Sequence, residues 1–159
     1  MTDATFEDAD DAPLRLMVQD AADLQVMAAL VQDAVFPITE MTWSKRQHRF
    51  ALLLNRFRWE DKAVAEHEGR PFERVRSLLV FENVLGVRTQ GIDREDRDTI
   101  LSVLSATFVR GKDGAGVVEL VLAGDGAVAL QVEALEAVLT DVSRPYRANS
   151  GRAPDHGAD

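Results

Sequence analysis

The stretch HRFALLLNRFR at residues 48–58 decides the fold. Its even positions carry Phe50, Leu52 and Leu54, while Leu53 lies among the odd positions. Successive side chains of a β-strand point to opposite faces, so both faces of this segment are apolar in the middle. Strands with two apolar faces lie inside a sheet rather than at its edge. We therefore predict a long central strand here.

Further runs of strand character flank this segment along the chain. They cover residues 14–18, 38–43, 73–89, 99–109, 117–122 and 127–132. The 73–89 run is either one strand or a hairpin broken near Glu82–Asn83. Gly124–Asp125–Gly126 is the clearest hairpin signal. Strands joined by short turns pair antiparallel, so we expect a mainly antiparallel sheet.

Two stretches have helical periodicity. In residues 21–33 apolar residues recur every three or four positions, and Asp20 precedes them as an N-cap. In residues 132–141, Leu135 and Leu139 fall on one helical face. The two helices would cover the apolar face of the sheet, which makes the chain an α+β protein. A partly open barrel with an early helix and a C-terminal capping helix resembles the layout of pleckstrin-homology-like domains.

The composition changes near both ends of the chain. Residues 1–12 contain five acidic residues and no basic one, and we expect a disordered acidic arm. Residues 147–159 are small and polar, and we expect a disordered tail there. Residues 13–146 have a suitable length for a single α+β domain.

Charge and cysteine content exclude several classes of protein. The chain of 159 residues has a net charge of -9, which weighs against nucleic-acid binding. It has no cysteine, so disulfides and thiolate metal ligands are excluded. We see no apolar run of about 20 residues, and the N-terminus lacks signal-peptide order. We expect a cytoplasmic protein that does not enter a membrane.

Four arginines form the most distinctive polar group. If residue 58 pairs with residue 74 across two antiparallel strands, Arg56, Arg58, Arg74 and Arg76 share one face. Guanidinium groups bind phosphates and carboxylates in a two-pronged manner, so these residues are candidates for an anion site. The alternative is local ion pairing, which the abundance of acids nearby favours. The candidate partners are Glu60, Asp61, Glu66, Glu68, Glu73 and Glu82.

Other candidate chemistry is sparse. His48, His67 and His156 are far apart in sequence, and no second histidine or cysteine completes a zinc pattern. The nucleophile, dinucleotide and phosphate-loop motifs are absent, so we expect no cofactor, no metal and no catalytic residue. Trp43 and Trp59 would form a partner surface if they were exposed together.

Several segments together resemble one protein family. They are LRLMVQDAADLQVMAALVQDAV at 14–35, RFALLLNRFRWE at 49–60, RVRSLLVFENVLGVR at 74–88 and VEALEAVLTD at 132–141. They resemble the alphaproteobacterial domain-of-unknown-function family 2948, and NRFRWE is the most specific piece. The resemblance implies a cytoplasmic bacterial protein and transfers no activity.

The sequence favours a non-enzymatic module that binds a protein partner or a small anionic ligand. Exposed strand edges could pair between copies, so we also expect a possible homodimer. The alternative is a small hydrolase or transferase that clamps a phosphorylated or acidic metabolite with the arginines. Glu82 and Ser77 are the nearest reactive residues, although Ser77 falls on the opposite side of its strand.

Overall fold

The computed structural model describes residues 12–147 and residue 154. The predicted acidic arm, apart from residue 12, and nearly all of the predicted tail lie outside the described residues. Within residues 12–147, no helix is both long enough and apolar enough to cross a membrane.

The described strands form one sheet of eleven, and all neighbouring strands pair antiparallel. Their order is β1-β10-β5-β4-β2-β7-β8-β9-β6, with β3 also pairing with β4 and β11 with β5. The strands are β1 (Arg15–Val18), β2 (Val35–Pro37), β3 (Met41–Ser44), β4 (Arg49–Phe57), β5 (Glu73–Phe81), β6 (Val84–Gln90), β7 (Ile100–Arg110), β8 (Gly116–Leu122), β9 (Gly126–Val132), β10 (Ala137–Asp141) and β11 (Tyr146–Arg147). The mainly antiparallel sheet is confirmed.

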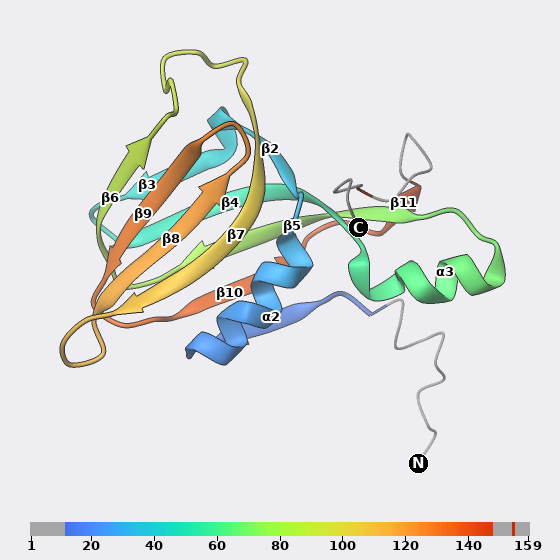
Figure 1. Cartoon of the computed structure of the whole chain (residues 1–159), viewed down its shortest axis with the longest axis horizontal. Coiled ribbons are helices and arrows are strands. Elements are labelled where there is room, and N and C mark those ends of the chain that lie inside the picture. The colour runs from blue at the N-terminus through green and yellow to red at the C-terminus, as the bar shows by residue number, and fades with distance from the viewer. Residues whose placement is uncertain (1–11, 148–153, 155–159) are drawn as a thin grey trace.

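The sheet folds over on itself into two layers (Figure 1). Strands β6, β9, β8 and β7 form one layer, and β3, β4, β5, β10 and β1 form the other. Buried side chains from both layers make a single hydrophobic core. Helix α2 (Ala21–Val31) adds Leu24, Met27 and Val31 to this core, and its N-cap Asp20 accepts a hydrogen bond from the Asp23 amide. The early helix therefore lies where its periodicity placed it.

The predicted C-terminal helix is wrong. Residues Ala137–Asp141 form strand β10, which pairs with β1 on one side and β5 on the other. Ala137 and Leu139 are buried, while Val138 and Thr140 are partly exposed, as expected for a strand. A helix here would leave the facing backbone groups of β1 and β5 without partners. Without a capping helix, the comparison with pleckstrin-homology-like domains loses its basis.

The 73–89 segment is neither one strand nor a hairpin. Strand β5 ends at Phe81 and pairs with β4 and β10, whereas β6 begins at Val84 and pairs with β9. Asn83, with a φ of 58°, turns the chain from one layer to the other. Between β4 and β5, the chain forms a 3-10 turn at Trp59–Asp61 and helix α3 at Lys62–Glu68.

Candidate functional site

The four arginines do not share one face. The observed register pairs Arg56 with Val75 and Arg74 with Phe57, one residue away from the predicted register. A slip of one residue moves every side chain of a strand to the other face. Arg56 therefore points to the inner side of the sheet, while Arg74 and Arg76 lie on the outer side. The prediction of a shared arginine face is wrong.

Arg56 is fully buried and is held by two carboxylates. Its Nη1 and Nη2 donate to the two oxygens of Glu60 at 2.9 and 2.8 Å, and Nη2 also donates to Asp141 Oδ1 at 3.1 Å. Ser77 Oγ accepts from Arg56 Nε at 3.0 Å and donates to Asp141 Oδ1 at 2.7 Å. Burial lowers the pKa of Arg56, but the hydrogen bonds and charges of Glu60 and Asp141 outweigh burial and raise it overall. Arg56 is thus a permanent, fully compensated cation.

A second network lies beside the first, around the buried Asp61. Arg70 donates to both oxygens of Asp61 at 2.9 Å, and Arg58 lies 3.7 Å from the same carboxylate. Arg58 also donates to Glu73 in a short contact. The hydrogen bond from Arg70 lowers the pKa of Asp61 against the effect of burial, and the charges of Arg58 and Arg70 add to the lowering. The network joins β4, α3 and β5.

In these networks Arg56 and Arg58 are paired with carboxylates of the same chain. Three arginines meet five carboxylates, namely Glu60, Asp61, Glu68, Glu73 and Asp141. No buried side-chain nitrogen or oxygen in the described part of the chain lacks a hydrogen-bond partner. Local ion pairing, the alternative considered above, therefore describes Arg56 and Arg58.

Arg74 and Arg76 differ from these two arginines. Arg74 is half-buried, and its Nη1 donates to the backbone and side-chain oxygens of Asn55 at 3.2 and 3.1 Å. Burial lowers the pKa of Arg74. The Arg76 side chain is exposed and makes no hydrogen bond or ion pair with any described residue. Anion binding by Arg74 and Arg76 stays a prediction.

Trp43 and Trp59 do not form a joint aromatic surface. Trp59 Nε1 donates to the Gln32 carbonyl at 3.0 Å, and its ring packs edge-on against Phe57 with centroids 4.8 Å apart. Trp43 lies opposite Phe50 and packs on the core. Phe50 and Phe57 are seven residues apart on β4, which is roughly 23 Å along a strand. A partner-binding role of either tryptophan stays a prediction.

The histidines are dispersed as well. His48 is exposed in the turn before β4, His67 is exposed on α3, and His156 lies outside the described residues. Across residues 12–147, no group of three or more histidine, aspartate or glutamate side chains could hold a metal ion.

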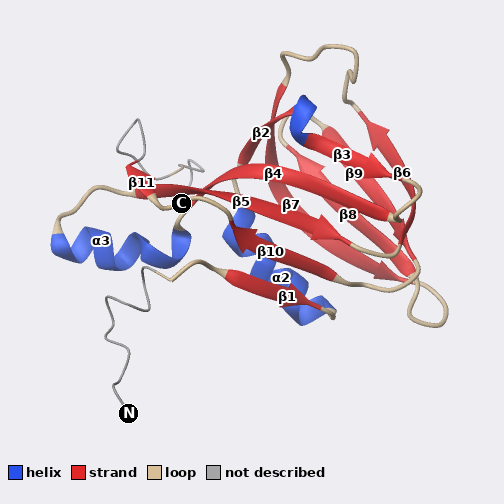
Figure 2. Cartoon of the chain, turned by 180° about the vertical axis from the view of Figure 1, so that it is seen from behind, coloured by secondary structure: helices blue, strands red, loops and turns tan. Residues whose placement is uncertain are grey.

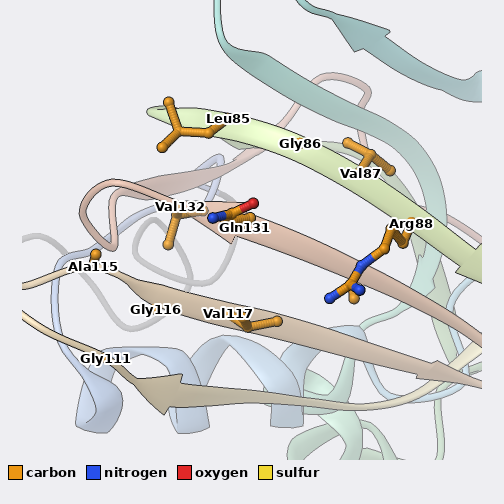
Figure 3. Close-up of a pocket in the computed structure, with 11 residues that line it drawn as sticks. Leu85, Gly86, Val87, Arg88, Gly111, Ala115, Gly116, Val117, Gln131 and Val132 are labelled. Atoms are coloured by element: carbon orange, nitrogen blue, oxygen red, sulfur yellow. The ribbon is translucent and has the colours of Figure 1, made fainter.

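A shallow groove follows the outer side of β9 (Figure 3). One hollow of about 540 Å³ and a second of about 400 Å³ share Arg88 and Ala129. The floor is made of small residues, and Arg88 from β6 and Glu119 from β8 flank Ala129 on either side. Gly116 lets β8 pack closely against β7, because an added Cβ would lie 2.4 Å from the Val109 carbonyl oxygen. The groove is a concave surface with one positive and one negative side chain, Arg88 and Glu119. None of its lining residues is a histidine, serine or cysteine.

The outer side of β1, β10, β5 and β4 has a different character. Two neighbouring rows of side chains cross these strands on the outer side. They are Met17, Val138, Val80 and Ala51, and then Arg15, Thr140, Leu78 and Leu53. Of these residues Arg15 alone is charged. We call this surface the apolar face.

The helices leave the apolar face open. Helix α2 packs on the inner side of the sheet, and α3 lies beyond one end of it (Figure 2). Met17 is 47% exposed, and the other apolar members of the two rows are half-buried among their neighbours. The outer side of β6, β9 and β8 instead mixes Ala127 and Ala129 with Arg88, Glu119 and Gln131.

The apolar face was not predicted, although the sequence contains a signal for it. Residues of both parities are apolar in β4, and the same holds for Leu78 and Val80 beside Leu79 in β5. We interpreted the two apolar sides of β4 as the sign of a central strand, and we expected the two predicted helices to cover the apolar face of the sheet. The second of these helices is strand β10 instead.

Comparison with known proteins adds a family. A family model described as "Protein of unknown function (DUF2948)" matches residues 14–156. No curated protein matches the chain, and no solved structure matches it.

Proposed function

The chain belongs to the family of proteins of unknown function DUF2948, and we propose that it is a small, non-enzymatic interaction module of the bacterial cytoplasm that docks a second copy of itself on the apolar face. The observation that carries this proposal is the open apolar face itself. Met17 is exposed and the other apolar side chains of this face are partly exposed. Contiguous apolar surfaces that reach solvent mark interaction sites in soluble proteins. The cysteine-free composition is compatible with a reducing compartment.

The size of the apolar face supports a dimer interface. Strands lie about 4.8 Å apart and rise about 3.3 Å per residue, so two outward rows across four strands cover roughly 250 Å² in projection. A standard interface buries about 800 Å² on each partner, with an apolar centre and a polar rim. The apolar face is large enough for the centre, and the residues around it would supply the rim.

Pairing through the strand edges receives less support. The path of paired strands ends at β1 and β6, and the short strands β3 and β11, of four and two residues, each pair on one side only. Strand β1 has four residues, and β6 is interrupted by a bulge at Leu85 between Val84 and Gly86. Short and bulged edge strands are poor templates for a further strand. We therefore assign self-association to a face of the sheet rather than to its edges.

The enzymatic alternative has no observation in its favour. Ser77 is fully buried and hydrogen bonded to Arg56 and Asp141, so a substrate could not reach it. Glu82 accepts from Arg49 Nε at 3.0 and 3.1 Å. Neither residue is placed as a nucleophile or base beside an open arginine pair.

Light scattering after size exclusion, from micromolar to near-millimolar protein, tests the proposal. We expect a dimer that Val80→Glu converts to a monomer, because the new carboxylate would be buried without a partner. Val121→Glu is the matched control, since Val121 is also a half-buried valine on an outer strand surface, in β8. A wild-type protein that stays monomeric throughout this range would overturn the proposal.

A further inference from the structure

Charges of opposite sign lie at the two ends of the apolar face. On β5, Arg76 lies two residues from Leu78 and on the same outer side, at one end of the apolar face. At the other end the Glu82 amide donates to the Glu136 carbonyl at 2.9 Å, which extends the β5–β10 ladder by one pair. By strand alternation Glu82 and Glu136 lie on the same outer side as Val80 and Val138. Along β5, six residues or roughly 20 Å separate Arg76 from Glu82.

These charges are available to a partner. Within the described residues, neither the Arg76 guanidinium nor the Glu136 carboxylate takes part in a hydrogen bond or an ion pair. Glu82 is paired with Arg49, and both side chains are partly exposed. By contrast, Arg56, Arg58 and Arg70 are paired with carboxylates of their own chain.

We infer that two copies pack apolar face to apolar face with their strands antiparallel, so that Arg76 of each copy meets Glu82 and Glu136 of the other. This inference rests on the proposed function and adds the symmetry and the polar contacts of the dimer. Its partner is a second copy of this chain. Under two-fold symmetry the charges at the two ends of the face are complementary.

The position of the symmetry axis follows from the register. Leu79 lies midway between Arg76 and Glu82 on β5. A two-fold axis that lies in the interface and crosses the strands at Leu79 exchanges the two ends of the face. It sets Arg76 of one copy over Glu82 of the other and stacks the Val80 row on the Leu78 row. Two-fold symmetry repeats each contact, so the dimer gains two sets of opposite charges.

The other face-to-face arrangement is electrostatically unfavourable. An axis parallel to the strands would keep each end over the same end of its partner. The Arg76 ends would then meet each other, and so would the Glu82 and Glu136 ends. Like charges placed together across an interface disfavour that arrangement. Packed sheets lie about 10 Å apart, a gap that long arginine and glutamate side chains at the rim can bridge from both sides.

Charge reversal tests the inference by analytical ultracentrifugation at low salt. We expect Arg76→Glu and Glu136→Arg each to raise the dimer dissociation constant by roughly tenfold or more, because each change acts twice in the dimer. The matched controls are Arg88→Glu on β6 and Glu119→Arg on β8, which lie beside the groove in the other layer and should leave the constant unchanged. Circular dichroism and thermal unfolding establish that each variant is folded.

Mixing the two variants distinguishes the outcomes. Because the reversed charges match one another across the proposed axis, an equimolar mixture of R76E and E136R should form heterodimers at concentrations where neither variant self-associates. If the wild type is dimeric, two results would overturn the inference: single variants that dimerise as tightly as the wild type, or a mixture of the two variants that forms no heterodimers. Either result would leave the proposed function standing. Monomeric wild type would overturn both.

Discussion

Replacing Asp141 by alanine should destabilise the protein by about 3–4 kcal/mol. Asp141 is one of two carboxylates that hold the buried Arg56. Removing one partner of a buried ion pair costs about 3–5 kcal/mol, because the remaining charge is left without compensation. Glu60 still accepts two hydrogen bonds from Arg56, which places the ionic loss at the low end. The Leu14 amide, which donates to Asp141 at 3.0 Å, would also lose its acceptor.

Urea unfolding at neutral pH, followed by the fluorescence of Trp43 and Trp59, measures this loss. The midpoint should fall while the slope with denaturant stays constant. Asp141→Asn keeps an oxygen acceptor, so it should cost less than the alanine variant. In a double-mutant cycle with Arg56→Met, the combined loss should be smaller than the sum of the single losses by at least about 1 kcal/mol.

Two results would refute this reasoning. One is a loss below about 1 kcal/mol for Asp141→Ala, which is the range of exposed ion pairs rather than buried ones. The other is strict additivity with Arg56→Met, which would mean that the two side chains stabilise the fold independently.

Two other predictions concern acid stability and glycine packing. The pKa of Asp61 is lowered in the folded protein, so its stabilising effect is complete above its unfolded pKa of about 3.9 and is lost as the pH falls below that value. Unfolding measured at a series of pH values should show that the free energy of unfolding declines below about pH 3.9, and that it declines less steeply in Asp61→Asn. An equal decline in both proteins would contradict the role given to Asp61. Gly116→Ala should cost about 1–3 kcal/mol because its Cβ would collide with the Val109 carbonyl. Gly86→Ala, whose Cβ would lie 3.7 Å from its nearest neighbour Gln131, should change stability by less than about 1 kcal/mol in the same urea assay.

Local patterns predicted those elements whose neighbours agreed with them. Helix α2 has a cap, an apolar stripe and an apolar core to receive that stripe. The β8–β9 hairpin has its turn at Gly124 and Asp125, which both take positive φ angles of 82° and 68°. In these segments one periodicity fits and no other structure competes.

The C-terminal segment shows where local patterns fail. Leu135 and Leu139 fit a helical face, while Ala137 and Leu139 equally fit one side of a strand. A segment of five residues is too short to distinguish the period of a helix from the period of a strand. The decision came from the open backbone groups of β1 and β5, which lie far away in the sequence. A long-range pairing of this kind leaves no local signal.

The arginine register failed for a related reason. Strands β4 and β5 are apolar on both sides, so the hydrophobic pattern does not reveal a slip of one residue. The observed register sets the large rings of Phe50 and Phe81 opposite each other in the core. It also places Arg56 beside Glu60 and Asp141 rather than beside Arg76. The identity of the candidate anion site therefore depended on a detail that composition does not encode.

The pairing of β1 with β10 has a consequence for synthesis of the chain. The Leu14 amide donates a hydrogen bond to the Asp141 side chain, which lies 127 residues away in the sequence. While the protein emerges from the ribosome, β1 cannot pair until β10 has been translated. Until then the edge of β5 is uncovered, and such edges promote aggregation of nascent chains. Long-range pairing of this kind makes folding slow for a domain of this size.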